Sequence, residues 1–309
     1  MTVPADESPE AESATETPPE RTVDSVSVVL LTKNAGSRFE DVLRSVEDQR
    51  CDAAVETVVV DSGSTDGTVE TAAEFGCELH TIDPEEFHHS RTRNLGGELS
   101  DGDVIVYLTQ DATPKDDRWL HRLVDPIERE RADVVYGRQI AYPDAKPVDE
   151  FFYSYFYPDE ERRLSGADAV DPRRFYLENV YVSDVSAAVW RDSWEQLRFR
   201  EDVGMSEDKD FALRALANGF DILYEPGAAV HHSHDYDLVS NFERRHEDGR
   251  AYAQIATEGD DEFVADGVEY VAAELRYLFE NGHARWVPYA LAYDFLHFLG
   301  FQTGKLRET

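Results

Sequence analysis

The chain has 309 residues, enough to bury a sizeable core as one large domain or as one and a half. It carries 65 acidic residues and 30 basic ones, which gives a formal net charge of −35. This balance argues against nucleic acid as a partner, because phosphate binding needs a positive face and no basic run is present.

Lysine is scarce, with five residues against 25 arginines. A large excess of carboxylates with few lysines keeps a protein hydrated at very high salt, where its self-repulsion is screened. We therefore expect a halophile's cytoplasm, and the alternative is a basic partner that docks on the acidic surface. Cys51 and Cys77 have no metal-ligand spacing and are expected to be reduced, with a disulfide between them as the alternative.

Residues 1–24 are rich in Glu, Pro, Ser and Thr and have almost no large apolar side chains, which predicts a disordered acidic tail. The tail has neither the basic start nor the apolar core of a signal peptide. The protein is therefore expected to stay in the cytoplasm.

Strand and helix patterns alternate after the tail. Residues 25–32 predict a buried parallel strand, and residues 39–46 place apolar side chains at helical spacing. A strand at 55–61, a helix to about Gly76 and a strand at 77–82 follow. This alternation predicts a parallel sheet of the nucleotide-binding type.

Polar side chains follow the first two predicted strands. The first strand ends in Thr32 and is followed by Asn34, and the second ends in Asp61 before a Ser/Gly turn. Asp66 is the predicted N-cap of the next helix. Ligands of α/β proteins bind at the carboxyl ends of strands, so Asp61 is a candidate binding carboxylate, and an ordinary capped turn is the alternative.

The sequence lacks both familiar phosphate loops after its predicted strands. There is neither a Gly-x-Gly-x-x-Gly segment nor a Gly-Lys-Ser/Thr segment, which argues against dinucleotide and Walker-type sites. A ligand would instead be held by Thr32, Asn34, Asp61 and Ser64, whose side chains suit a base and a ribose.

Two further segments point to the same sheet edge. The helix that opens near Phe87–Gly96 carries Arg93 close to its start, where a solvated arginine is the alternative to a binding residue. The buried strand at 103–108 is followed by Gln110 and Asp111, which delivers a second carboxylate.

Together these segments resemble the family 2 glycosyltransferases of the GT-A fold, in particular their rhamnosyltransferase-like branch. The resemblance covers residues 25–235. The motifs that carry it are Thr32-x-Asn34, Asp61-x-Gly-Ser-x-Asp-Gly-Thr68, Phe87-x-His-x-x-x-Arg93-Asn94 and Thr109-Gln-Asp111. The last motif departs from the family's Asp-x-Asp, because its first carboxylate is missing and one metal ligand is left there.

The resemblance implies an α/β fold in which a Rossmann-like nucleotide-binding mixed sheet flanked by helices occupies residues 25–237 and a helical extension occupies 238–309. It also implies a divalent cation, Mn²⁺ or Mg²⁺, as cofactor. The residues implied to contact the nucleotide-sugar donor are Thr32, Asn34, Asp61, Ser62, Ser64, Asp66, Arg93 and Gln110.

A catalytic base and further metal ligands come from the second half of the chain. Acidic residues in the first turn of a predicted helix at 205–214 suit its dipole, but in the resembling family this is the Glu-Asp motif, and Asp208 matches the catalytic Asp. His231, His232 and His234 lie at a predicted strand end, where neutral imidazoles suit an Mn²⁺-like ion. With Asp111, the resemblance makes His232 and His234 the candidate ligands, without deciding between them.

The roles of two aromatic segments, within residues 143–182 and at 286–301, have two interpretations each. The cluster within residues 143–182 is either core or an acceptor platform, because sugar rings stack on aromatic faces. Residues 286–301 are apolar but too short and too polar to span a bilayer. This segment either lies in a membrane interface or packs on the catalytic domain.

The resulting hypothesis is an inverting glycosyltransferase at the cytoplasmic face of the cell membrane. Its donor is a nucleotide-sugar, and its acceptor is a lipid-linked, dolichol-phosphate-type glycan, by similarity to haloarchaeal enzymes that N-glycosylate surface-layer glycoproteins. The alternatives are a nucleotidyltransferase, which would need a Gly-rich basic loop after the first strand, and a non-catalytic nucleotide-sugar-binding scaffold, which would not need Asp208.

Overall fold

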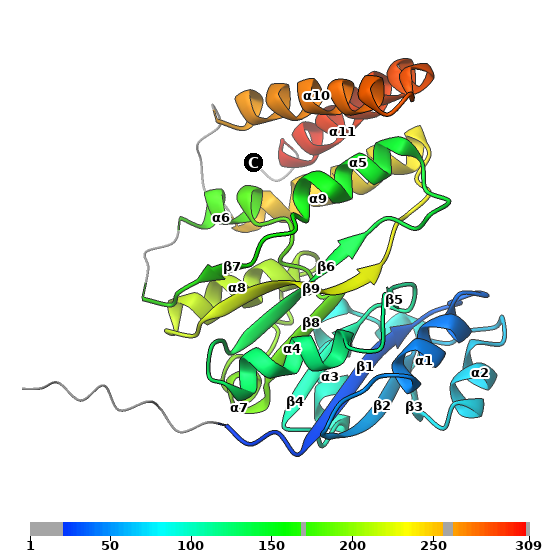
Figure 1. The fold of residues 1–309 in the computed structure, drawn as a ribbon, viewed down its shortest axis with the longest axis vertical. Helices are drawn as coiled ribbons and strands as arrows, with labels where there is room; N and C mark the ends of the chain where they lie inside the picture. The colour runs from blue at the N-terminus through cyan, green and yellow to red at the C-terminus, as the bar shows by residue number, and fades with distance from the viewer. Residues whose placement is uncertain (1–20, 168–170, 256–261, 307–309) are drawn as a thin grey trace, which may run out of the picture.

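The computed structural model describes residues 21–167, 171–255 and 262–306, and within them one mixed sheet forms the centre of the molecule (Figure 1). Its strands are β1 (Ser25–Thr32), β2 (Ala54–Asp61), β3 (Glu78–Thr81), β4 (Val104–Leu108), β5 (Thr113–Pro114), β6 (Val134–Ile140), β7 (Arg162–Leu164), β8 (Ser186–Trp190) and β9 (Ile222–His231). Their order is β3-β2-β1-β4-β8-β6-β9-β5, and β7 also pairs with β9. The predicted α/β class with a mixed sheet is confirmed.

Helices cover both faces of this sheet and add a further layer. They are α1 (Phe39–Glu47), α2 (Thr68–Glu74), η1 (Pro84–Glu86), α3 (His89–Leu99), α4 (Trp119–Glu128), α5 (Pro147–Phe156), α6 (Pro172–Glu178), α7 (Arg191–Leu197), α8 (Glu207–Ala217), α9 (Leu238–Ile255), α10 (Glu262–Glu280), η2 (Ala284–Trp286) and α11 (Val287–Lys305). Buried side chains of α1 and α4 pack on one face, while α3, α7 and α8 lie on the other. Above the sheet in Figure 1 lie α5, α9, α10 and α11.

The first half of the sheet is parallel, as the sequence predicts. β1 pairs in parallel with β2 and β4, and β2 pairs in parallel with β3. The register sets Thr32 beside Asp61, so the polar residues that follow these strands meet at one edge. β8 then runs antiparallel to both β4 and β6, which makes the sheet mixed.

Strand β9 is longer than the sequence suggests. Pro226 and Gly227 indicate two separate segments, but the structure has one strand from Ile222 to His231. The register between β6 and β9 shifts between Gly137 and Arg138, opposite the Pro-Gly pair. A bulge tolerates a proline because it breaks the hydrogen-bond ladder locally, so the strand continues to the histidines.

The boundary of the predicted tail needs correction. Residues 1–20 lie outside the described part of the chain, but residues 21–24 pack on the domain. Arg21 forms an ion pair of 2.6 Å with Asp133, and Val23 is buried. The ordered chain therefore begins before β1.

The C-terminal helices pack on the rest of the domain. Helix α11 lies along α9, and α10 contacts both α11 and α5. In the described ranges, no helix combines the length and apolarity that a membrane span requires. Cys51 and Cys77 are free thiols, as predicted.

Candidate active site

Three loops at the carboxyl ends of β1, β2 and β4 form one hydrogen-bonded unit, which we call the strand-end rim (residues 32–36, 61–68 and Gln110). The backbone N–H of Lys33 donates to Gln110 Oε1 at 2.8 Å, and the N–H of Asn34 donates to Ser64 Oγ at 2.8 Å. Most of the residues expected to contact a nucleotide therefore do lie together, held in place by one another.

Asp61 is the centre of the strand-end rim. Its carboxylate is fully buried and accepts four hydrogen bonds, from the hydroxyls of Thr32 and Ser64 and from the backbone N–H groups of Gly63 and Ser64. Burial alone would raise the Asp61 pKa, but these donors outweigh it and hold the pKa below its usual range. The Asp61 carboxylate thus fixes the turn in addition to its position at the sheet edge.

The other rim residues join the loops to each other. Asn34 has a left-handed φ of 46°, and its Oδ1 accepts from the N–H of Thr65 at 2.8 Å. Ser62 Oγ donates to the Thr32 carbonyl. Lys33 Nζ donates to the carbonyls of Ser62 and Gly63 at 2.7 and 2.8 Å. A lysine held in this way does not form the basic phosphate loop that a nucleotidyltransferase would need.

Asp66 differs from its predicted role as helix N-cap. Gly67 occupies the N-cap of α2 with a φ of 95°, a left-handed conformation that glycine adopts without strain. Asp66 precedes it, and its Oδ1 accepts from the backbone N–H and hydroxyl of Thr68, while its Oδ2 accepts from the N–H of Gly36. The carboxylate therefore ties α2 to the loop after β1.

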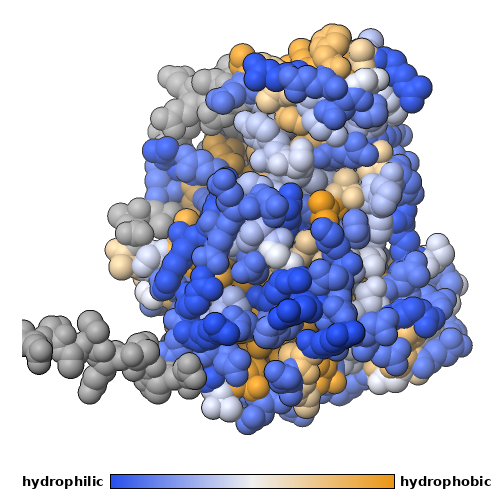
Figure 2. Space-filling view, in the orientation of Figure 1, coloured by the Kyte–Doolittle hydropathy of each residue, from blue (hydrophilic) through white to orange (hydrophobic). Residues whose placement is uncertain are grey.

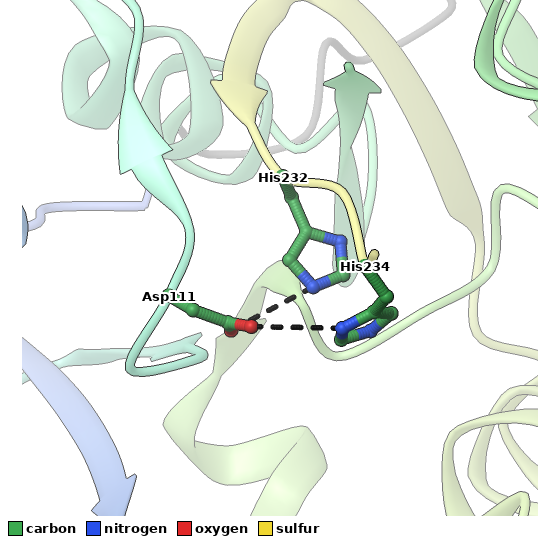
Figure 3. A group of neighbouring side chains, drawn as sticks. All are labelled: Asp111, His232 and His234. Carbon is green, nitrogen blue, oxygen red and sulfur yellow. Dashed lines mark ion pairs between the residues drawn. The ribbon is translucent and has the colours of Figure 1, made fainter. Parts of the chain in front are cut away.

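Asp111, His232 and His234 form a cluster that suits a metal ion (Figure 3). Asp111 comes from the loop after β4, and both histidines follow the end of β9. One ligand atom from each of the three lies within 4.8 Å of the others. Asp111 is 3.6 Å from His232 Nε2 and 3.8 Å from His234 Nδ1. His231 instead stacks on Tyr142, so two of the three histidines enter the cluster.

Gln139 on β6 fixes the orientation of His232. Its Oε1 lies 2.8 Å from His232 Nδ1, so that ring nitrogen donates its proton to the amide oxygen. The lone pair of Nε2 then faces Asp111. Burial lowers the pKa of His232 to about 4, which keeps the imidazole neutral. A neutral ring with a partner on its far nitrogen is the form that ligates metals.

The cluster lines a cavity of about 480 Å³ that also contains Asp208. Asp208 lies in the first turn of α8, beside Glu207, at the point where Ser206 adopts a left-handed φ of 62°. Burial and the neighbouring Glu207 carboxylate raise the pKa of Asp208. A carboxylate with a raised pKa is a stronger proton acceptor, which suits a general base.

Arg93 lies among buried carboxylates beside Asp208. Its guanidinium contacts Glu207, and its Nε is 3.1 Å from Asp184, with both acidic side chains almost fully buried. Burial alone would lower the pKa of Arg93. The neighbouring Glu207 and Asp184 side chains raise it, and their effect is larger, so the pKa of Arg93 lies above its usual value. Burial also raises the pKa of Asp184 to about 8. Arg93 lines the cavity, but its charge is paired with the Glu207 carboxylate inside the protein, and its contact with a nucleotide-sugar stays a prediction.

Two other arginines are better placed for an anionic ligand. Arg244 and Arg245 on α9 line the cavity, and both contact Asp248. The Arg244 side chain is 45% exposed, and its contact with Asp248 is long, at 3.4 Å. Arg244 therefore retains donors that can face the cavity.

Sequence reasoning missed several residues of this cavity. Gln139 lies on β6, Asp184 in the loop before β8, Asp248 on α9 and His297 on α11, and these segments lie far apart in the sequence. The pattern of β6 gave no distinct signal for Gln139, because the charged Arg138 precedes it in the same strand, but the structure buries Gln139. His297 shows that α11 contributes to the wall of the cavity, so this segment packs on the catalytic domain, one of the two interpretations that the sequence left open.

Comparison with known proteins identifies the family. Residues 27–195 match the family model described as Glycosyl transferase family 2. The chain is 31% identical over 285 residues to the O-antigen chain rhamnosyltransferase RfbN of Salmonella typhimurium, an alignment that covers 91% of this chain and 89% of that protein. This chain therefore belongs to the family 2 glycosyltransferases. The glycosyltransferase prediction is confirmed, and the nucleotidyltransferase and scaffold alternatives lose their support.

A second relative and a solved structure extend the comparison. The glucosyl-dolichyl phosphate glucuronosyltransferase of Haloferax volcanii is 31% identical over 138 residues, which is 43% of each protein. The mannosyltransferase PcManGT from Pyrobaculum calidifontis, solved with GDP-Man and Mn²⁺, superposes with a TM-score of 0.60 at 17% identity, over 93% of this chain and 88% of that one. The latter likeness confirms the predicted GT-A fold.

Proposed function

We propose that this glycosyltransferase moves a sugar from a nucleotide-sugar to a lipid-linked acceptor, with inversion at the anomeric carbon and with Asp208 as the base. One observation carries the proposal. Asp208 and the Asp111, His232 and His234 cluster line the same cavity of about 480 Å³. A proton acceptor and a set of metal ligands thus face one space that can hold a sugar.

The donor set fits a divalent cation. Asp111 supplies a carboxylate oxygen, and His232 and His234 supply neutral ring nitrogens whose pKa values burial lowers. Mg²⁺ prefers oxygen ligands and retains water, whereas imidazole suits softer divalent ions, so this set favours Mn²⁺ over Mg²⁺. When bound, such an ion would neutralise negative charge on the diphosphate that leaves.

Asp208 performs the proton transfer in this scheme. The acceptor hydroxyl donates its proton to the Asp208 carboxylate while its oxygen attacks the anomeric carbon, and the bond to the nucleoside diphosphate breaks on the opposite side. A single displacement inverts the anomeric centre and leaves no covalent enzyme intermediate. The buried pair of Arg93 and Glu207 holds the first turn of α8, and with it Asp208, in place.

The strand-end rim holds the nucleoside in the same scheme. Thr32, Asn34, Asp61 and Ser64 lie at the carboxyl ends of β1 and β2, the edge where α/β proteins bind ligands. Gln110 connects this rim to Asp111 through adjacent positions in the chain. Arg244, which lines the same cavity, supplies positive charge for the diphosphate.

A dolichol-phosphate-type glycan is the proposed acceptor, assembled at the cytoplasmic face of the membrane for N-glycosylation of surface-layer glycoproteins. The name of the Haloferax relative, which includes a dolichyl phosphate, supports a lipid-linked acceptor. The acidic, lysine-poor composition supports a halophilic host. Aromatic side chains of α5 line the cavity, where they offer faces for a sugar ring.

The proposal is tested by measuring the binding and hydrolysis of UDP-, GDP- and dTDP-sugars by the purified protein. The assay runs in multimolar KCl, with Mn²⁺, with Mg²⁺ or with EDTA. We expect one nucleotide-sugar to bind in a metal-dependent way and to release its diphosphate slowly. Transfer to dolichyl-phosphate-linked glycans but not to free sugars would support the acceptor class. Failure of every nucleotide-sugar to bind would contradict the proposal.

A further inference from the structure

Helix α11 has two faces with different surroundings. His297 and Phe301 line the cavity that contains Asp208. Leu291, Phe295 and Leu299 are 46%, 63% and 38% exposed. The spacing of four residues places these three apolar side chains on one side of the helix, and His297 lies about 200° around the helix from both Phe295 and Leu299. The helix therefore separates the cavity from an exposed apolar stripe.

The charge of this segment is opposite to that of the chain. Residues 281–306 contain one acidic residue, Asp294, and two basic ones, Arg285 and Lys305, whereas the whole chain has 65 acidic and 30 basic residues. The segment therefore carries far fewer carboxylates than the rest of the chain, which removes a barrier to its approach to a lipid surface.

Helix α10 also carries exposed apolar side chains. Val268 and Phe279 of α10, which packs against α11, are 67% and 63% exposed. Figure 2 shows orange, apolar surface at the top of the molecule, over α10, while most of the remaining visible face is blue. Trp286 and Tyr289, half-buried at the start of α11, are side chains that favour the headgroup region of a bilayer.

We propose that the α11 stripe, formed by Leu291, Phe295 and Leu299, docks the enzyme on the surface of a lipid membrane. The helix would lie in the interface, because its length and apolarity do not suit a span. The opposite side of the same helix lines the cavity, so the sugar end of a membrane-bound acceptor can enter while its lipid stays in the bilayer. Only this last step rests on the proposed function.

Sedimentation with vesicles of phosphatidylglycerol and phosphatidylcholine tests the proposal. The variant combines Leu291→Ser with Phe295→Ser, and the control is Val55→Ser, which changes a side chain that is 40% exposed at the start of β2. We expect the wild-type protein and the control to sediment with vesicles and the double variant to lose at least about tenfold in the bound-to-free ratio. At multimolar KCl the ionic part is screened, so the apolar stripe should still support binding.

Two results would overturn the proposal. One is that the wild-type protein fails to sediment with vesicles, or that the double variant sediments equally well. The other is a concentration-dependent dimer that Leu291→Ser and Phe295→Ser abolish, because the stripe would then be an interface between copies of this chain. Circular dichroism shows whether the double variant is folded, and a variant with Phe295→Ser alone replaces it if it is not.

The outcome is separable from that of the proposed function. Hydrolysis of a nucleotide-sugar in the absence of lipid should be the same for the wild-type protein and the double variant, because neither Leu291 nor Phe295 lines the cavity. Vesicle binding without nucleotide-sugar binding would leave the docking surface standing while the proposed function fails. Nucleotide-sugar binding without vesicle binding would support the proposed function and contradict the docking surface.

Discussion

The strand-end rim and the cavity beside it are built in different ways. The rim joins short loops that follow neighbouring parallel strands, and its central carboxylate, Asp61, has four donors within those loops. The cavity gathers charged and aromatic side chains from α3, α5, α8, α9 and α11 and from the ends of β4 and β9. A rigid rim suits the part of a ligand that does not react, such as a nucleoside. A cavity lined by both acidic and basic side chains suits the centre where bonds change.

Buried Asp carboxyl groups have opposite net pKa shifts in the two regions. In the rim, hydrogen bonds outweigh burial and hold the pKa of Asp61 below its usual range. In the cavity, burial prevails at Asp184 and Asp208 and raises their pKa values, whereas Arg93 holds the pKa of Glu207 below its usual range. Perturbed carboxyl groups of the second kind cluster at sites of proton transfer. The comparison therefore supports the proposal that proton transfer takes place in the cavity and that the nucleoside binds at the rim.

The largest expected change in stability follows from removing Arg93. Arg93→Gln leaves the Glu207 carboxylate buried without its counter-charge and removes the partner of the buried Asp184 carboxyl, which should lower the free energy of unfolding by about 3–5 kcal/mol. Guanidinium denaturation measures the loss. The control is Arg91→Gln, whose 56% exposed side chain pairs with Glu201 and should contribute less than about 1 kcal/mol. Equal effects of the two variants would contradict the buried network.

Asp61→Asn tests the rim in the same assay. The amide replaces one acceptor oxygen by a donor and leaves rim donors unpaired, at a cost of about 1–3 kcal/mol. The depressed pKa of Asp61 also contributes stability that is present above its unfolded value and is lost as the pH falls through the folded one. The wild-type advantage over Asp61→Asn should therefore shrink in acid. A constant difference at all pH values would speak against this account, and exposed Asp52→Asn serves as control.

Gln139 allows a test of whether His232 needs its hydrogen bond to bind a metal ion. Gln139→Leu removes the acceptor that orients His232, which should weaken Mn²⁺ binding about 10–100-fold. Titration calorimetry measures the affinity. Gln139→Glu keeps an acceptor in the same place and should restore most of it. Unchanged Mn²⁺ affinity in the leucine variant would show that His232 does not depend on this bond.

The effect that depends most on pH concerns Glu274, a buried residue of α10 outside both regions. Burial raises its pKa to about 9, so the folded protein holds a proton that the unfolded chain releases above its own lower pKa. This group's contribution to stability is present below the unfolded pKa and is lost as the pH rises toward 9. Glu274→Gln should therefore raise the melting temperature at pH 8 relative to the exposed control Glu269→Gln, and the difference should vanish near pH 4.

Much of the rim could be predicted from the sequence because its information is local. β1 and β2 end in Thr32 and Asp61, and the parallel register alone brings these residues side by side. The N-cap was misplaced by one residue, because Gly67 adopts a left-handed conformation that Asp66 does not provide. Such an error is small, and Asp66 still ties the two loops together.

Much less of the cavity could be predicted, because its contacts join distant parts of the chain. Asp184, in the loop before β8, pairs with Arg93 of α3, and His297 reaches the cavity because α11 packs along α9. Periodicity predicts that such helices exist but not where they dock. Asp208 and the histidines were found through their motifs, and motifs do not reveal supporting residues such as Gln139.

The most direct test of the central claim is the turnover of Asp208→Asn with a bound nucleotide-sugar and a competent acceptor. A general base contributes about 10²–10⁴-fold, so kcat should fall by that factor while the Kd of the donor stays the same. Asp192→Asn, at an exposed position on α7, should behave as wild type. Turnover of Asp208→Asn at the wild-type rate would contradict the assignment of this carboxylate as the base.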